Sequence, residues 1–247
     1  MSFYEAMERY YDDIFPLQQG NLDFLAKTLG SSQNKHILDL ACGTGTYTVA
    51  LASRGFQVTG IDLDDTMIRL AEQKKELHGC NEGSKVSFLK GDMLKLSSSL
   101  QLQYDGAFCI GNSLVHLETA GEIEAAVKEI AAVLSRGAVL IVQIVNYDRI
   151  LSHAIKSLPT LENKERGVSF ERLYNYDKQK HKIHFTGILN LPDSSSRTNT
   201  IPLYPLQRDE LEEILTNAGF RLRQFYGSFS GEPWSGDTPA TISVASL

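Results

Sequence analysis

The amino-acid sequence predicts an α/β protein built on a doubly wound, mostly parallel, seven-stranded Rossmann-like sheet. Short apolar segments alternate with amphipathic segments of helical period between about residues 35 and 146, which indicates βαβ units. Residues 138–146 form a nearly continuous apolar run, typical of a strand buried on both faces. Polar and apolar residues then alternate over 168–204, which predicts an antiparallel β-hairpin insertion covering the carboxyl edge of the sheet.

Each element has its own signal along the chain. Apolar residues spaced by three and four positions predict helices over 3–14 and around 22–29. Strands are then expected at about 35–41, 56–62, 86–89, 104–110 and 138–146. Helices are expected between them at about 45–54, 64–78 and 123–133. A helix at about 207–218 and strands near 220–229 and 240–245 complete the sheet. We therefore expect the N-terminal helices and core at 1–158, the β insertion at 159–205 and the closing elements at 206–247.

Composition narrows the class of partner. The chain has 247 residues, 42% of them hydrophobic, and a formal charge of −6. Such a surface repels phosphate backbones, so no nucleic-acid partner is expected, and the basic cluster Lys178–Lys182 is interpreted as a solvated hairpin turn. The apolar run 138–145 is too short to span a bilayer, so no membrane partner is expected.

The three cysteines, Cys42, Cys80 and Cys109, form no CxxC pair. Two of them lie in apolar strand or turn segments, which suits small buried thiols rather than disulfide partners or zinc ligands, and no metal site is predicted. An odd number of cysteines without a signal peptide predicts a cytoplasmic protein. The apolar stripe of the first helix leaves monomer and homodimer open, because it suits a lid, a core helix or a dimer contact.

The most informative segment follows the first predicted strand. Gly43 and Gly45 form a glycine-rich turn between this strand and a helix, and Asp62 ends the next strand. This arrangement lets the backbone approach a nucleoside-bearing cofactor while a carboxylate accepts the ribose hydroxyls. A dinucleotide site would place a third glycine at position 48, where this chain has Thr48. A dinucleotide-dependent oxidoreductase is therefore the disfavoured alternative.

Residues 38–46, Leu-Asp-Leu-Ala-Cys-Gly-Thr-Gly-Thr, resemble the first motif of class I S-adenosylmethionine-dependent methyltransferases. The resemblance implies S-adenosyl-L-methionine as cofactor, with Gly43 and Gly45 near its methionine part and Asp62 on its ribose. It places Asp92 and Met93 beside the adenine, although Asp92 is also a typical turn-stabilising residue. The other cofactor contacts expected are Asp39, Ala41, Leu63, Ile110 and His116.

Three further segments, 110–117, 146–151 and 203–205, together with the tyrosine-rich first helix, resemble the glycine and glycine/sarcosine N-methyltransferases. This resemblance implies that Asn112 holds the acceptor near the methyl group and that Tyr204 and Tyr11 line the pocket. His116 would lie by the cofactor. The alternatives are that His116 is a histidine at a helix start and that Tyr204 is a packing aromatic beside Pro205.

One position departs from this branch. The glycine enzyme has an arginine immediately before Asn-Tyr-Asp, which anchors the acceptor carboxylate, whereas this chain has Val145. Valine cannot replace a bidentate arginine contact, so glycine is an expected acceptor only if another cation takes over. Arg172 in the covering insertion is the candidate for substrate binding, and its alternative is a surface ion pair.

The expected chemistry is an in-line SN2 transfer of a methyl group to a small-molecule acceptor. Proximity and alignment supply about 7–11 kcal/mol of such a barrier. No histidine is paired with a carboxylate at a recognisable spacing, which favours an amine over a weakly acidic hydroxyl as nucleophile. A small-molecule O- or C-methyltransferase and a non-catalytic S-adenosylmethionine-binding protein remain as alternatives.

Overall fold

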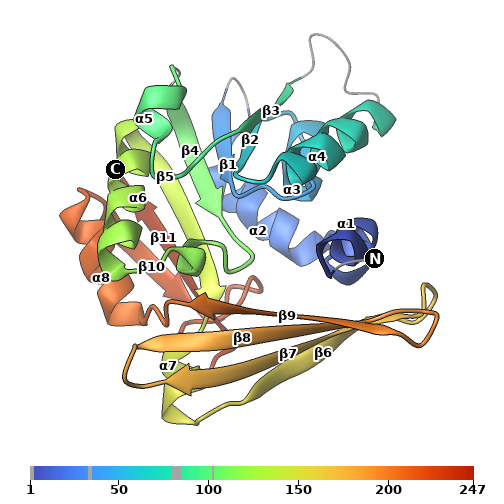
Figure 1. Cartoon of the computed structure of the whole chain (residues 1–247). Helices are drawn as coiled ribbons and strands as arrows, with labels where there is room; N and C mark the ends of the chain where they lie inside the picture. The colour runs from blue at the N-terminus through green and yellow to red at the C-terminus, as the bar shows by residue number, and fades with distance from the viewer. Residues whose placement is uncertain (1–2, 33–34, 79–84, 102) are drawn as a thin grey trace.

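The computed structural model describes residues 3–32, 35–78, 85–101 and 103–247, which form two β-sheets with helices around the larger one (Figure 1). Sheet A comprises β1 (His36–Leu40), β2 (Gln57–Asp62), β3 (Val86–Lys90), β4 (Tyr104–Cys109), β5 (Leu134–Val145), β10 (Arg221–Tyr226) and β11 (Ala240–Ser246). Its strand order is β10–β11–β5–β4–β1–β2–β3. Strands β1 to β5 are parallel, and β11 is antiparallel to both of its neighbours. The predicted fold class is confirmed.

Helices cover both faces of sheet A, and β5 shows why. Leu140 packs into an apolar cluster with α6 (Ala120–Ala132) and α8 (Arg208–Asn217), near the short α5 (Leu96–Ser99). Its neighbour Ile141 faces the opposite cluster, which includes α2 (Gln19–Leu29) and α3 (Thr46–Ser53). Helix α4 (Asp65–Leu77) packs at the β2–β3 side. Consecutive residues of a strand point to opposite faces of the sheet, so a continuous apolar run needs helices packed on both faces.

Sheet B is the predicted insertion. It is antiparallel, in the order β6 (Ser157–Asn163), β7 (Val168–Asp177), β8 (Lys182–Asn190) and β9 (Ser196–Leu203). Helix α7 (Tyr147–Ser152) connects it to β5. The basic cluster Lys178–Lys182 forms the β7–β8 turn and the start of β8, in agreement with its interpretation. Neither α7 nor β6 was expected from the sequence, because α7 has only 6 residues and β6 is an edge strand interrupted by Pro159.

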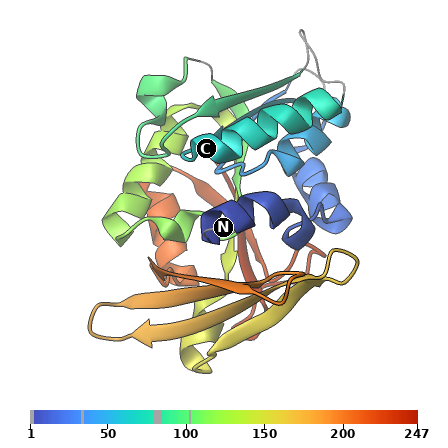
Figure 2. The same ribbon diagram turned by 45° about the vertical axis from the view of Figure 1, so that its right-hand side comes forward.

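Helix α1 (Phe3–Ile14) lies between the carboxyl edge of sheet A and sheet B (Figure 2). Its apolar stripe is covered within the chain, because Ala6, Tyr10 and Ile14 pack against Val168, Phe170, Leu189 and Leu191 of the insertion. Burial of this stripe fixes the helix over the gap between the two sheets. Helix α1 therefore serves as a wall of the space that the two sheets enclose.

Two of the three cysteines fall within the described residues. Cys42 and Cys109 are free thiols, and Cys109 is buried, as the sequence suggested. Cys80 lies outside the described residues. Across the described segments, no helix combines the length and the apolar character needed to cross a bilayer.

Candidate active site

A cavity of about 610 Å³ lies between the carboxyl edge of sheet A, helix α1 and sheet B. Loops after four parallel strands line its sheet A side: Ala41 and Gly43 after β1, Asp62 to Asp64 at β2, Gly91 to Met93 after β3, and Gly111 to Ser113 after β4. Ligands of open α/β sheets bind at this edge, and the volume is typical of small-molecule sites. The cavity is therefore the candidate active site.

The glycine-rich turn bends sharply around Gly43. Ala41, Gly43 and Gly45 all have left-handed backbone conformations, with φ of 55°, 55° and 73°. Gly43 lines the cavity, and a Cβ there would lie 3.1 Å from the Tyr11 hydroxyl oxygen. Gly45 does not line the cavity, and its Cβ would lie 2.4 Å from the Phe88 ring. Gly43 thus keeps the cavity wall open, whereas Gly45 allows close packing behind it.

Asp62 is held in place by the backbone around it. Its Oδ2 accepts from the Gly43 N–H at 2.8 Å, and its Oδ1 accepts from the Asp64 N–H at 3.0 Å. Each carboxylate oxygen keeps further lone pairs for a ligand, and the side chain lines the cavity. The geometry suits the predicted contact with a ribose diol.

The predicted adenine contacts Leu63, Asp92 and Met93 also line the cavity. Leu63 is 66% exposed, an unusual value for a leucine beside a cavity. The Asp92 Oδ1 accepts from the Leu94 N–H at 2.9 Å, so this carboxylate stabilises its turn. The flat face of an aromatic base would cover Leu63, and the cradle therefore suits an adenosyl group.

Asp39 lies beneath the turn rather than on the cavity. Its side chain is 3% exposed, and its Oδ2 accepts from the Thr48 hydroxyl at 2.5 Å. Thr48 stands where a dinucleotide motif has its third glycine. In this chain its hydroxyl binds the buried Asp39 carboxyl group instead. Burial raises the pKa of Asp39 to about 8, and the charge of Asp62 adds to the rise against the effect of Thr48.

This pKa predicts a pH-dependent stability. An aspartate in the unfolded chain has a pKa of about 3.9, so the folded state binds this proton more tightly. Its contribution is complete below about pH 4 and is lost as the pH rises towards 8, by on the order of 1 kcal/mol per pH unit. As the pH rises from about 4 to 8, we expect the free energy of unfolding of Asp39→Asn to fall less than that of the wild type. Urea titrations at several pH values measure both. Parallel pH profiles would contradict the assignment.

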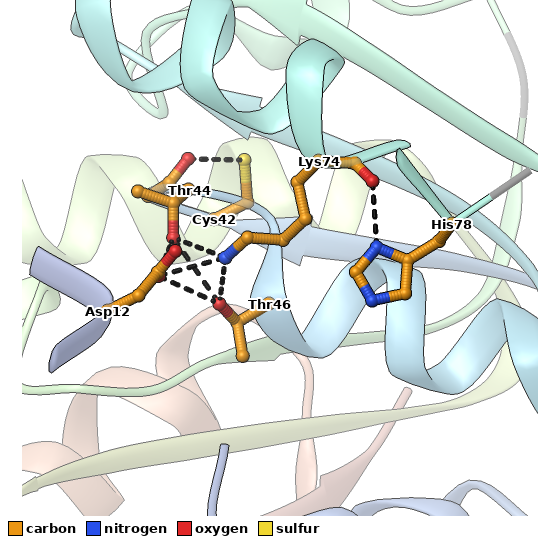
Figure 3. A network of polar contacts seen from close by, with 7 residues as sticks. Asp12, Cys42, Thr44, Thr46, Lys74 and His78 are labelled. Atoms are coloured by element: carbon orange, nitrogen blue, oxygen red, sulfur yellow. Dashed lines mark hydrogen bonds and ion pairs between the residues drawn. The ribbon is translucent and has the colours of Figure 1, made fainter. Parts of the chain in front are cut away.

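The N-terminal helix is fastened to the turn by a polar cluster (Figure 3). The Lys74 ammonium of α4 donates to the Asp12 carboxylate at 2.8 Å and to the Thr44 and Thr46 hydroxyls at 2.9 and 2.5 Å. The Thr44 hydroxyl also donates to Asp12 at 2.6 Å. This cluster connects α1, the turn and α4. It holds Tyr11, one residue before Asp12, against the cavity.

Tyr11 is a neutral hydroxyl donor at this wall. Its ring packs against Phe15 with centroids 5.1 Å apart. Burial and the nearby Asp62 carboxylate raise the pKa of Tyr11 to about 12. The predicted position of Tyr11 in the pocket agrees with its place in the cavity wall.

Asn112 lines the cavity, but its amide is already engaged. The Oδ1 accepts from the Val145 N–H at 2.9 Å, and the Nδ2 donates to the Tyr147 hydroxyl at 3.0 Å. Asn112 has a φ of 70°, so these bonds hold a strained residue between the ends of β4 and β5. The fully buried Tyr147 had not been singled out; its place directly after a strand in Asn-Tyr-Asp was the available signal.

His116 lies in a short 3-10 helix, η1 (Leu114–His116), and lines the same cavity. Burial lowers the pKa of its imidazole, which favours the neutral ring. His116 is the last residue of this helix, so the alternative of a histidine at a helix start is not met, and its place in the cavity wall is compatible with the predicted position by the cofactor.

Four of the predicted residues do not line the cavity: Asp39 and Gly45, described above, and Tyr204 and Ile110. Tyr204 directs its hydroxyl to Glu210 Oε1 at 2.6 Å, and its ring contacts His181. Leu203 lines the cavity, and alternation along β9 turns the next residue away. Ile110 packs instead with the apolar cluster around α2. The structure therefore places Tyr204 and Ile110 outside the cavity wall, where an acceptor contact and a cofactor contact were expected.

Sheet B supplies the opposite wall, which sequence reasoning missed apart from Arg172. Eight side chains or glycines of one face line it: Phe170, Arg172, Tyr174, Phe185, Gly187, Asn199, Ile201 and Leu203. Their period of two along each strand was visible, but which face meets the cavity depends on strand register. Apart from Asn199, the side chains around Arg172 on this wall are apolar or aromatic.

Arg172 has no acidic partner among the described residues. Its Nη2 donates to the Pro159 carbonyl at 2.6 Å, and its Nε is buried with no hydrogen-bond partner. Burial lowers the pKa of the guanidinium, which remains charged because an arginine starts from a very high value. The alternative of a surface ion pair is not what the described residues show.

Comparisons with known proteins agree with the fold and the turn. Residues 37–137 match the family model of a methyltransferase domain. The glycine/sarcosine N-methyltransferase of Aphanothece halophytica is 28% identical over 88% of this chain and 77% of its own length. The CcbJ methyltransferase of Streptomyces caelestis superposes with a TM-score of 0.82 at 21% identity, over 98% of this chain and 96% of that chain.

A second solved structure contains the expected cofactor. The amino pentose methyltransferase CalS10 of Micromonospora echinaspora, determined with S-adenosylmethionine bound, has a TM-score of 0.67 and 20% identity, and the match covers 100% of this chain and 97% of that chain. The solved structures agree with the fold. The class follows from the matched methyltransferase domain model and the curated relative, together with the glycine turn and Asp62: the chain is a class I S-adenosylmethionine-dependent methyltransferase. Within that class it is similar to the glycine/sarcosine N-methyltransferases.

We expect Asp62→Ala to weaken binding of S-adenosylmethionine and of S-adenosylhomocysteine by 10-fold or more. Hydrogen bonds to a charged group contribute about 1.5–3 kcal/mol, and the alanine removes both acceptor oxygens. Isothermal titration calorimetry measures the change. Asp65→Ala is the matched control, because Asp65 is exposed and paired with Lys90 outside the cavity. Equal affinities for the two variants would remove Asp62 from the site.

Proposed function

We propose that this protein transfers a methyl group from S-adenosylmethionine to the nitrogen of a small amine that carries a carboxylate. The observation that carries the proposal is Arg172, a half-buried guanidinium on the cavity wall without an acidic partner among the described residues. A buried cation needs an anion, and arginine matches a carboxylate with two parallel hydrogen bonds. It stands in for the arginine that Val145 replaces.

The charges of the cavity separate the two proposed binding regions. Asp62, Asp64 and Asp92 lie at the sheet A edge, where the adenosyl group is proposed to bind, and Arg172 lies on sheet B. A carboxylate is repelled from the first region and attracted to the second. The acceptor nitrogen is thereby directed towards the space between them, which helps to align it for in-line attack.

An amine suits the residues between these regions. The sulfonium supplies a methyl group that is already activated; the nitrogen lone pair forms the new N–C bond, and the electron pair of the broken C–S bond stays on sulfur. The nitrogen must arrive unprotonated, which the apolar wall favours because it disfavours an ammonium ion. A proton then leaves the methylated nitrogen for water. The glycine/sarcosine N-methyltransferase relative supports nitrogen as the nucleophile.

The test uses amines in matched pairs with and without a carboxylate, such as alanine with ethylamine and phenylalanine with phenethylamine. Formation of S-adenosylhomocysteine gives the rate, and isotope-labelled methyl groups locate the new bond by NMR. We expect turnover of the carboxylate member and label on nitrogen. Equal turnover of both members, or label on oxygen or carbon, would contradict the proposal.

A further inference from the structure

We infer that the acceptor carries a bulky apolar or aromatic substituent beside its amine and carboxylate, and that glycine and sarcosine are poor acceptors. This inference rests on the proposed function, because it uses Arg172 as the carboxylate anchor. It adds the class of side chain that the same cavity selects. The reasons lie in the composition and register of sheet B.

The strand register places an apolar row directly beside the anchor. Arg172 pairs across the sheet with Gly187, and Gly187 pairs with Asn199. The next row on the same face is Tyr174, Phe185 and Ile201, all of which line the cavity. The Tyr174 and Phe185 rings contact each other with centroids 5.4 Å apart. A carboxylate at Arg172 would therefore place the rest of the acceptor against this row.

Helix α1 faces this wall with more apolar surface. Phe3 and Met7 of the helix and Phe15, which follows its last residue, line the cavity. The Phe15 ring meets Phe170 edge-on with centroids 5.8 Å apart. Glycine has no side chain, so its binding would leave these surfaces in contact with water. A large apolar substituent removes that contact and gains roughly 25 cal/mol for each Å² buried. The cavity thus favours the larger acceptor.

Gly187 sets the shape of the wall. A Cβ at this position would lie 2.6 Å from the tip of the Phe170 ring. Because Gly187 has no side chain, the tip of the Phe170 ring can approach the backbone of β8 at this position. An added methyl group has to displace the Phe170 ring, which lines the cavity. Gly187 is therefore a specificity-determining position.

The experiment compares kcat/KM for glycine, sarcosine, alanine and phenylalanine at saturating S-adenosylmethionine, with phenethylamine as the acceptor that lacks the carboxylate. We expect phenylalanine to exceed glycine by about 100-fold, which corresponds to about 2.7 kcal/mol. Glycine matching phenylalanine, while phenethylamine stays a much slower acceptor than either, would overturn this inference and leave the proposed function standing. Phenethylamine matching phenylalanine would instead overturn the proposed function.

Two variants test the wall itself. Gly187→Ala should raise KM for phenylalanine by about 10-fold, the size of a modest steric clash, and change KM for alanine less. Ile201→Thr keeps the branched shape but lowers apolar contact, so it should reduce the preference for phenylalanine in a chain that folds. Gly20→Ala is the control, since nothing lies within 4 Å of a Cβ there. An unchanged preference in both wall variants, with cofactor affinity retained, would refute the inference.

Discussion

Arg172→Gln is expected to lower kcat/KM for carboxylate-bearing acceptors by about 100-fold or more. A buried charge pair that loses one partner costs about 2–5 kcal/mol in affinity, and glutamine cannot supply the charge. The guanidinium lies on sheet B, whereas the proposed adenosyl contacts lie on loops of sheet A, so the affinity for S-adenosylmethionine should stay unchanged. Steady-state kinetics and calorimetry on the same preparation separate the two effects.

The decisive comparison is with an acceptor that has no carboxylate. Phenethylamine does not use the anchor, so its slow turnover should be unaffected by Arg172→Gln. Arg136→Gln is the matched protein control, because Arg136 is exposed on β5 and does not line the cavity. If the variant lost activity equally for acceptors with and without a carboxylate, Arg172 would be a structural residue and not the anchor.

The core of sheet A could be predicted because its signals are local. Most of the parallel strands contain short apolar runs, and the turn between Leu40 and Thr46 has glycines at two of its three left-handed positions, with Ala41 at the third. Asp62 follows from the same logic, since a strand end places its side chain at the carboxyl edge. Helix ends differ from the expected positions by only a few residues, as with α8 at Arg208–Asn217.

The acceptor wall could not be predicted in the same way, because its position depends on contacts between distant segments. Tyr204 and Leu203 are adjacent in sequence, yet only Leu203 faces the cavity, and one step of register decides which. For Arg172 the sequence favoured a surface ion pair over a substrate contact, and the partners of β7 were needed to place it on the cavity wall. The hydrogen bonds of Asn112 could not be predicted either, because Val145 and Tyr147 lie more than 30 positions away in the sequence, at the end of another strand.

Gly45→Ala is expected to destabilise the fold by about 2–5 kcal/mol. A left-handed conformation costs a residue with a Cβ about 1–2 kcal/mol, and forcing a methyl group into a packed region costs about 1–3 kcal/mol more. Both apply at φ of 73°, with the new Cβ 2.4 Å from the Phe88 ring and 3.1 Å from the Ala71 Cβ. Urea unfolding followed by circular dichroism gives the free energy directly.

Gly20→Ala separates this effect from the general consequence of replacing a glycine. Gly20 lies in α2 with open space around its Cβ, so alanine there should leave the fold as stable or raise its stability by about 0.5–1 kcal/mol. Gly45 also precedes α3 directly, so strain at this position tilts the start of the helix that carries Thr48 beneath the turn. A Gly45→Ala variant as stable as the wild type would mean that the Phe88 ring moves aside without cost. The packing of Phe88 against Gly45 would then not determine the shape of the glycine-rich turn.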